Sequence, residues 1–514
     1  MIKIVPSLFF LAANYLFLKE AYFLSTFQEF ASVTIFLLCS FLLISLISLV
    51  IPGILFSCLV YLYLLIASII NYFKFYYKIV ISSTLIQSVI HTDAREASEL
   101  FNLSFLIWFM LTGILPCILF WLTTKYTSLL RKKAKDILII GTFLITGLVS
   151  NICILPANIH TFRYLSNALC SFMPFNYIIS LKNYLSLYKT TNSAENITKV
   201  FTFEIDPTDQ ENLNVILVIG ESARADRWGI NGYQRNTTPN LAHLQNLITY
   251  KEAYSLATNT PLGIQSIMKK EGYYHLSSFI KVFDQLKFKT YWFSNQGTRY
   301  KLINLIAAEA SENLFSDDIR ISNTGNNYDT DLIPFVRDIL VKNKNKSNMV
   351  VLHTIGSHRL YDLRYPNEFK VFNPTCINNE LYYSTNECLD AEKLGNSYDN
   401  TIVYTDYFLS ELIEILGETN SILIYISDHG ESLGENGIYA HSYPFELAPI
   451  EQKHIPLIIW ASKKFLAKKT NLDKFLNASK KTEIKVDQSN IFHSILDCVG
   501  INSEAIDYNK SLCR

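Results

Sequence analysis

The segment SILIYISDHGES at Ser421–Ser432 is the clearest indication of the fold of the carboxy-terminal half of the chain. It is an apolar run, rich in isoleucine, that ends in a cluster of acidic, basic and small residues. Two other stretches have the same form, NVILVIGES at Asn214–Ser222 and NMVVLHTIGSH at Asn348–His358. Because each apolar run is continuous and not alternating, it predicts a central strand of a parallel sheet that is covered on both faces. We therefore expect an α/β domain from residue 212 onward.

The polar residues that follow these runs are expected to meet at one edge of the sheet. Ligands of open α/β sheets bind at the carboxyl ends of the strands, where Glu221, Asp428 and His429 would lie. One imidazole and two carboxylates suit a divalent ion such as Zn²⁺, and three protein ligands leave a position for a reactive group. Each of these residues taken alone also has a purely structural explanation. In an Asp-His pair after a strand, the aspartate is often a cap and the histidine is often a core residue with its hydrogen bonds satisfied.

Two further histidines are candidates for binding a substrate. His358 ends the second run, and His441 lies in the segment GIYAHSYPFELAP. Together they could bind phosphoryl oxygens or protonate a leaving alkoxide, although a lone histidine in a loop is more often a surface residue. His353 lies inside an apolar run and is interpreted as a core residue.

A threonine-rich segment, YSLATNTPLGIQSIM at Tyr254–Met268, supplies a candidate nucleophile. Its Thr-Asn-Thr-Pro sequence predicts the start of a helix, where backbone N–H groups and the helix dipole favour a bound phosphate. A metal ion could activate the hydroxyl of Thr260 for attack. A plain helix cap by Thr258, Asn259 or Thr260 explains the same residues without chemistry, and the local sequence by itself favours that cap.

The amino-terminal part of the chain has a different composition. Half of the 514 residues are hydrophobic and 18% are charged, but only sixteen of the ninety charged side chains precede position 160. Runs of about 20 apolar residues predict transmembrane helices. Five such runs occur, at Ile4–Leu24, Ala31–Ile51, Ile54–Tyr72, Phe101–Leu122 and Ile137–Leu155. The first could instead be a signal peptide, but it has no evident cleavage site and another span follows at once.

Two patterns place the carboxy-terminal half outside the cytoplasm. A dense basic cluster lies between the fourth and fifth spans, and cytoplasmic loops hold such charge. The fifth of the five spans would then carry the chain across the membrane to the outside. Cys376 and Cys388 stand close together in a polar loop, which suggests a disulfide and an oxidising compartment, with two free thiols as the alternative. Cys498 and Cys513 are a second candidate pair on weaker grounds.

These patterns predict three parts: a membrane domain at 1–160, interfacial helices and a linker at 161–211, and a catalytic domain at 212–514. The composition excludes a disordered chain. The 45 basic and 45 acidic residues cancel, so no overall charge recruits nucleic acid.

Together the motifs resemble one family, the membrane-bound phosphoethanolamine transferases of Gram-negative bacteria, in the sulfatase/alkaline-phosphatase-like superfamily. The resemblance runs in order along most of the chain. It is carried by VIGESARADRWGINGYQRNTTPNL at 218–241, SHRLYDLRYP at 357–366, NSYDNTIVYTD at 396–406 and SDHGESLGENGIYAHSYPFELAPIEQKHIPLIIW at 427–460. The loop with TDAREASEL at 92–100 resembles the family's outside loop, implicated there in handling the lipid donor.

The resemblance implies a multi-span membrane domain, a sulfatase-like α/β domain in the periplasm, and transfer of phosphoethanolamine from phosphatidylethanolamine to lipid A or another envelope glycan. It implies Thr260 as the nucleophile and a metal ligand, one or two zinc ions, donor-phosphate binding by two histidines, and one family disulfide. The implied residues are Glu221, Thr260, Asp428 and His429 for zinc, His358 and His441 for the donor or a second zinc, and Cys376 with Cys388.

The chain also departs from the family, and alternatives stay open. Leu256 and Ser266 stand where many members have cysteines, and His358 is followed by Arg-Leu instead of Gly-Pro, which leaves the branch and its acceptor undecided. A polyglycerol-phosphate synthase that uses phosphatidylglycerol shares the fold, the metal and the threonine. A sulfatase would need a formylglycine motif with an arginine, which TNTPLGI lacks. A membrane receptor with a degenerate enzyme domain is disfavoured by the complete ligand set.

Overall fold

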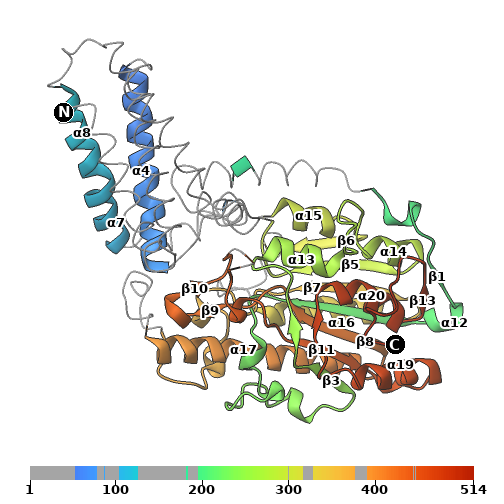
Figure 1. Cartoon of the computed structure of the whole chain (residues 1–514). Helices are drawn as coiled ribbons and strands as arrows, with labels where there is room; N and C mark the ends of the chain where they lie inside the picture. The colour runs from blue at the N-terminus through green and yellow to red at the C-terminus, as the bar shows by residue number, and fades with distance from the viewer. Residues whose placement is uncertain are drawn as a thin grey trace, which may run out of the picture. The chain divides into compact units, whose positions relative to one another are not determined.

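The computed structural model describes residues 53–77, 86, 103–125, 181–182, 195–298, 300–316, 328–376, 390–443, 445 and 447–514 (Figure 1). The chain divides into two compact units, one that extends to Ser186 and one that begins at Leu187. Each unit has its own helices and its own packed interior, and each is described by itself.

Two long helical segments are described in the amino-terminal unit. The first is α4 (Gly53–Tyr77), and the second runs through α7 (Leu103–Phe109), η2 (Met110–Ile114) and α8 (Leu115–Lys125) without a break. Within the described residues, the stretch Leu103–Leu122 is the one helix long and apolar enough to cross a membrane. These helices coincide with the predicted spans at 54–72 and 101–122. The other three predicted spans and the TDAREASEL loop lie outside the described residues.

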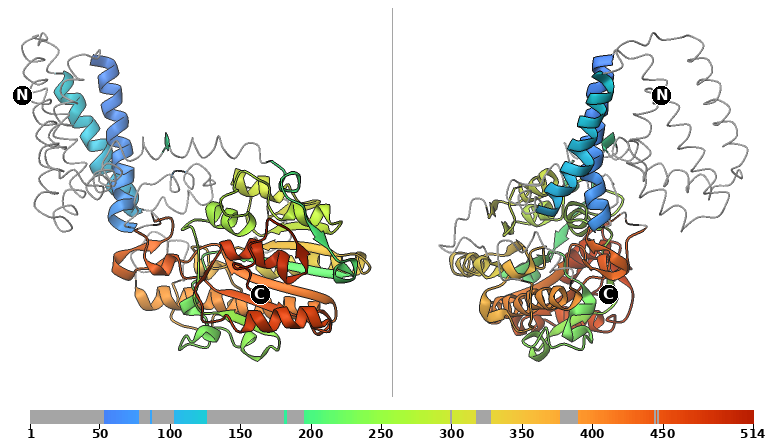
Figure 2. Two further views of the ribbon diagram at one scale, coloured as in Figure 1. Left: turned by 45° about the vertical axis from the view of Figure 1, so that its right-hand side comes forward. Right: turned by 90° about the vertical axis from the view of Figure 1, so that its left-hand side faces the viewer.

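Small and hydroxylated side chains join these two helical segments, which lie side by side (Figure 2). The Ser68 and Thr112 hydroxyl oxygens are 2.7 Å apart, and the Trp108 indole Nε1 donates to the Ser68 carbonyl at 3.0 Å. A side chain at Gly113 would place its Cβ 3.2 Å from Ser68 Cβ. The glycine therefore lets the backbones approach closely, and the interhelical hydrogen bonds set their register.

The carboxy-terminal unit is built on a seven-stranded sheet in the order β3-β11-β8-β2-β7-β5-β6. The strands are β2 (Leu213–Gly220), β3 (Leu247–Tyr250), β5 (Lys289–Ser294), β6 (Glu312–Phe315), β7 (Asn348–His353), β8 (Asn420–Ser427) and β11 (Leu457–Ala461). From β8 to β6 every neighbouring pair is parallel, whereas β11 is antiparallel to both β8 and β3. The prediction of a mostly parallel sheet is confirmed, and the three apolar runs form adjacent strands at its centre.

Both faces of the sheet are covered, as the continuous apolar runs predicted. On one face, alternate residues of β2 pack in the main core with α13 (Thr260–Met268), α14 (Ile280–Gln285), α15 (Lys301–Ala307) and α20 (Ser489–Cys498). On the other face lies α17 (Ala391–Leu416), which is buried along most of its length (Figure 1). Helices thus cover both faces of the sheet, and every residue of β2 and β7 is buried.

The remaining helices and short strands complete the surface. The helices are α12 (Pro207–Gln210), α16 (Ile333–Lys342), α18 (Lys463–Leu466) and α19 (Lys469–Ser479). Three two-stranded pairs lie outside the main sheet: β1 (Glu204–Ile205) with β13 (Ile501–Asn502), β4 (Ala253–Tyr254) with β12 (Val486–Asp487), and β9 (Ser432–Leu433) with β10 (Tyr439–Ala440). The last two pairs position the segments that lead to Thr260 and His441.

A candidate metal and nucleophile site at the strand ends

Strand register brings the three predicted ligands together. Gly220 of β2 pairs with Ser427 of β8, so the residues that follow both strands leave the sheet at the same level. Glu221, Asp428 and His429 are each fully buried, and one ligand atom from each lies within 4.8 Å of the others. His429 Nε2 is 3.4 Å from Glu221 Oε1 and 3.3 Å from Asp428 Oδ2. These residues form a cluster with the size and composition of a metal site.

Thr260 faces this cluster from the first turn of α13. Its hydroxyl oxygen is 3.2 Å from Glu221 Oε2 and 3.4 Å from His429 Nε2. The helix cap is a different residue, because the Asn259 side chain accepts a hydrogen bond from the Leu262 N–H at 3.2 Å. Asn259 therefore satisfies the helix end, and the Thr260 hydroxyl is turned toward the carboxylate and the imidazole.

The hydrogen bonds of His429 determine which ring nitrogen faces the cluster. His429 Nδ1 lies 2.8 Å from the Gly430 carbonyl oxygen, which can only accept, so Nδ1 carries the hydrogen. Burial lowers the pKa of His429 to about 3, and the ring is neutral near pH 7. Its Nε2 lone pair then points at two carboxylates. Metal-binding histidines have this arrangement, in which the other ring nitrogen donates to a carbonyl.

The carboxylates of the cluster need a cation. Burial, and next the charge of Glu221, raise the pKa of Asp428 well above its usual range. Asp428 Oδ1 accepts from the backbone N–H groups of Ser222 and His429 at 3.1 and 2.7 Å, while Oδ2 has no hydrogen-bond partner within the described part of the chain. Two buried carboxylates and an imidazole lone pair repel one another in a low-dielectric interior. A divalent ion would satisfy all three groups, so this donor set fits a metal.

The turn that carries Asp428 and His429 depends on Gly430. A side chain there would place its Cβ 2.1 Å from the Glu451 carbonyl oxygen, closer than any real contact. Glycine is therefore required here, because only a residue without a Cβ allows this close backbone approach.

Gln296 was missed by the reasoning from sequence. It follows β5, and its Nε2 donates to Glu221 Oε2 at 2.8 Å and to the Thr354 carbonyl at 2.9 Å. The other carboxylate oxygen of Glu221 accepts from Ser222 Oγ at 2.8 Å. The same rule that identified Glu221, a polar residue just after a parallel strand, would have found Gln296 had the run at 289–294 been recognised as a strand.

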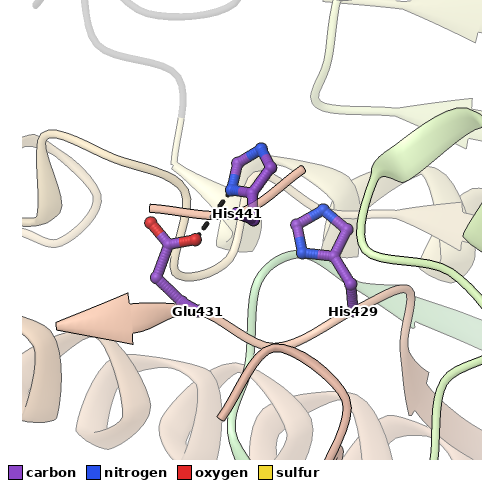
Figure 3. Close-up of side chains that lie close together, drawn as sticks. All are labelled: His429, Glu431 and His441. Atoms are coloured by element: carbon purple, nitrogen blue, oxygen red, sulfur yellow. Dashed lines mark hydrogen bonds and ion pairs between the residues drawn. The ribbon is translucent and has the colours of Figure 1, made fainter. Parts of the chain in front are cut away.

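His441 lies beside the cluster and is held by a residue that the sequence did not single out. His441 Nδ1 is 2.7 Å from Glu431 Oε2, and the His429 and His441 ring centroids are 4.3 Å apart (Figure 3). The other oxygen of Glu431 accepts from the Tyr361 hydroxyl at 2.8 Å. Burial by itself would lower the pKa of His441, but the charge and hydrogen bond of Glu431 raise it above the usual value. His429, Glu431 and His441 form a second group able to hold a metal.

His358 approaches the site from the loop after β7. The His358 and His441 ring centroids are 6.1 Å apart, so the two predicted substrate-binding histidines are neighbours. His353, in contrast, is buried in β7 with Nδ1 3.0 Å from Ser294 Oγ, in agreement with its interpretation as a core residue.

Of the two predicted disulfides, one lies entirely within the described residues and the other only in part. Cys498 and Cys513 form a disulfide with a Cα–Cα distance of 5.4 Å. Cys376 is disulfide-bonded, whereas its predicted partner Cys388 lies outside the described residues, and that pairing stays a prediction.

A mostly parallel sheet with a buried cluster of carboxylates and histidine at its strand ends is typical of the sulfatase-type enzymes of the alkaline-phosphatase-like superfamily. Residues 213–501, more than half of the chain, match the Sulfatase family model. Residues 36–188 match the family described as Phosphoethanolamine transferase EptA/EptB. The chain belongs to the sulfatase family and, within it, to the membrane-bound phosphoethanolamine transferases.

Known proteins of this kind are similar over most of their length. The Kdo(2)-lipid A phosphoethanolamine 7''-transferase of Escherichia coli K12 is 28% identical over 477 residues, 86% of this chain and 83% of that protein. The phosphatidylethanolamine transferase Mcr-1 of Escherichia coli is 27% identical over 429 residues, 78% of this chain and 77% of its own. The integral membrane lipooligosaccharide phosphoethanolamine transferase A of Neisseria meningitidis has a similar fold, with a TM-score of 0.80 at 24% identity over 99% of this chain and 96% of that one. The predicted fold, a helical membrane domain with a sulfatase-like domain, is thus confirmed.

Proposed function

We propose that this enzyme transfers phosphoethanolamine from phosphatidylethanolamine to a lipid A or lipopolysaccharide acceptor, with Thr260 as the nucleophile. The observation that carries the proposal is the position of the Thr260 hydroxyl, 3.2 Å from Glu221 and 3.4 Å from His429 at the edge of a buried ligand cluster. The names of the relatives support the donor and the acceptor class, because one is a phosphatidylethanolamine transferase and another acts on lipid A.

Four residues would hold the metal: Glu221, Thr260, Asp428 and His429. When bound, a zinc ion would lower the pKa of the threonine hydroxyl and neutralise charge on the phosphoryl oxygens. We propose one ion here, and the group of His429, Glu431 and His441 has the composition to hold a second.

The reaction would proceed in two steps. In the first, Thr260 Oγ forms a bond to phosphorus and the bond from phosphorus to the diacylglycerol oxygen breaks, which leaves phosphoethanolamine on the threonine. The leaving alkoxide needs a proton. His441, held through Nδ1 by Glu431, has its Nε2 available to give that proton, with His358 as its neighbour. In the second step an acceptor hydroxyl or phosphate attacks the same phosphorus and restores Thr260.

The membrane segment has a role in this reaction. The donor and the acceptor are both lipids or lipid-linked, so an enzyme held at the same surface meets them at high effective concentration. We propose that the carboxy-terminal domain lies on the periplasmic side of the bacterial inner membrane, where the proposed Cys376–Cys388 disulfide would be stable.

Mass spectrometry of the full-length protein with phosphatidylethanolamine tests the nucleophile. The wild-type protein should gain a phosphoethanolamine group on the peptide that contains Thr260, and Thr260→Ala should lose both the adduct and transfer while it still folds and binds zinc. An adduct on that peptide in the variant would refute the assignment. Phosphatidylglycerol in parallel tests the rival donor, since a glycerol-phosphate adduct would indicate a polyglycerol-phosphate synthase.

The acceptor is tested in cells. Lipopolysaccharide and envelope glycans from strains with and without the gene should differ by a phosphoethanolamine increment on lipid A or the core. An increment confined to another glycan would move the acceptor assignment and leave the chemistry of Thr260 unchanged.

A further inference from the structure

The segment that leads to Thr260 is held by the amide of one buried glutamine, Gln488. This residue is fully buried and lies between β12 and α20. Its Oε1 accepts from the Leu256 N–H at 2.9 Å. Its Nε2 donates to the carbonyl oxygens of Asp428 at 2.6 Å and Ser427 at 3.2 Å. The amide therefore joins the loop before the proposed nucleophile to the end of the strand that carries two proposed metal ligands.

The partners determine the orientation of this amide. A backbone N–H can only donate and a carbonyl can only accept, so Oε1 must face Leu256 and Nε2 must face Asp428. The single acceptor and both donors of the side chain have partners, and none of them faces solvent. Such a fully satisfied buried amide specifies one arrangement of the segments that it joins.

The main chain around Gln488 adds to the same connection. β12 pairs in parallel with β4, and the Gln488 N–H donates to the Tyr254 carbonyl at 3.1 Å. The backbone of Gln488 thus holds Tyr254, and its side chain holds Leu256 two residues later. Only three residues separate Leu256 from Thr260, which leaves the loop little freedom.

A second contact involves the Asp428 carbonyl group, to which the Gln488 side chain donates. Gly263, in the first turn of α13, lies so close to Asp428 that an added Cβ would be 2.4 Å from the Asp428 carbonyl oxygen. The helix that carries Thr260 therefore rests directly on the backbone of Asp428, and Gln488 hydrogen-bonds the same oxygen. Residues 256 and 266 are leucine and serine, so no cysteine at either position can supply a covalent tie.

We propose that Gln488 is a positioning residue for phosphoryl transfer, whose side chain sets the distance between Thr260 and the strand end at Asp428. The inference rests on the proposed role of Thr260 as nucleophile. Reacting groups must be held in near-attack geometry, and a displacement of about 1 Å can cost about 10²-fold in rate. Removal of the amide would also leave the Leu256 N–H and the Asp428 carbonyl without this partner.

The test compares Gln488→Met with the wild type in purified, zinc-loaded, full-length protein. Methionine has a similar length and shape but forms no such hydrogen bonds. With excess phosphatidylethanolamine in detergent, single-turnover mass spectrometry should show adduct formation on Thr260 slowed about 10²-fold. Zinc content should be unchanged, and KM for the donor should stay within about threefold, because the residue touches neither the donor histidines nor a ligand atom.

A second variant separates hydrogen bonding from packing. Gln488→Glu keeps an oxygen for the Leu256 N–H and, when its buried carboxyl is protonated, one donor for a carbonyl. It should recover part of the rate that methionine loses. If both variants are equally slow, or if Gln488→Met forms the adduct within about threefold of the wild-type rate, the positioning role is wrong.

Asn348→Leu is the matched control for the loss of a buried amide. Asn348 is fully buried at the opposite end of the sheet, where its Nδ2 donates to Asn214 Oδ1 at 2.8 Å and the Lys346 carbonyl at 3.1 Å. This variant should lose thermal stability but keep the adduct rate of the folded protein. An equal slowing in Asn348→Leu, or loss of zinc in Gln488→Met, would overturn the inference. Absence of any adduct in the wild type would instead overturn the proposed function on which it rests.

Discussion

Two histidines, 4.3 Å apart between ring centroids, have opposite electrostatic environments. His429 is fully buried, donates from Nδ1 to a carbonyl, and has a pKa lowered to about 3. His441 faces Glu431 through Nδ1, and that carboxylate raises its pKa. A neutral ring with a lone pair can bind a metal, and a ring that is readily protonated can donate a proton to a leaving oxygen. The difference supports the proposed roles, in which His429 is a metal ligand and His441 is an acid.

The largest effect should come from the ligand side of this comparison. Asp428→Asn keeps the Oδ1 that accepts from Ser222 and His429, but it replaces the charged Oδ2 with an amide facing His429 Nε2. Zinc affinity should fall, and transfer should fall by about 10³-fold or more. The metal-free variant should melt above the metal-free wild type, because the repulsion between buried carboxylates is relieved. Calorimetry with and without zinc checks this, and a lower melting temperature in the metal-free variant would argue against a metal site.

A smaller effect is expected from the acid side. His441→Gln should lower kcat by about 10²-fold and leave zinc content unchanged, whereas His429→Gln should lose the metal. Metal analysis together with steady-state kinetics separates the two variants. Equal loss of zinc in both would mean that the two rings act as one ligand set and that the contrast between them is wrong.

The origin of the contrast can be tested through pH. In Glu431→Gln the pKa of His441 should fall, because the carboxylate that raises it is gone. The alkaline limb of the kcat profile should therefore move to lower pH, with a modest change in kcat at its optimum. If the alkaline limb of the variant lies at the same pH as in the wild type, His441 is not the group that transfers the proton.

The pair formed by His441 and Glu431 should also affect the stability of the fold in a defined direction. The folded-state pKa of His441 lies above the unfolded value of 6.5. The pair thus stabilises the fold fully below that pH, and its contribution is lost as pH rises through the folded-state pKa. Unfolding measured across this range should show a weaker pH dependence in Glu431→Gln than in the wild type.

The smallest effect concerns the separate roles of Asn259 and Thr260 at the start of α13. Asn259→Ala removes the cap and should cost about 1 kcal/mol of stability, with activity reduced far less than in Thr260→Ala. Thermal unfolding and adduct formation measured on both variants provide the check. Loss of the adduct in Asn259→Ala at full folding would show that the cap and the nucleophile are not separable.

Local sequence was sufficient for the centre of the fold. β2, β7 and β8 were each predicted from a continuous apolar run. β2 and β8 end directly before Glu221 and Asp428, and β7 ends five residues before His358. The ligand candidates Glu221, Asp428 and His429 were found because each follows its strand directly, so short-range order is enough to bring them to one edge. β11 was not predicted to be antiparallel, since strand direction depends on where the chain enters the sheet and not on local composition.

Local patterns in the sequence were enough to predict that apolar strands carry carboxylates and imidazoles to a common edge, because the burial of a strand and the polar residues at its end are both visible in a short run. Which side chains complete that edge depends on how distant segments of the chain pack against one another. Glu431 and Gln488 act on partners that are 10 and 60 residues away in the chain. Such contacts depend on distances between segments, which no local pattern encodes. The same holds for Thr260: its neighbour Asn259 takes the cap, and the close packing of α13 on Asp428 turns its hydroxyl toward the cluster.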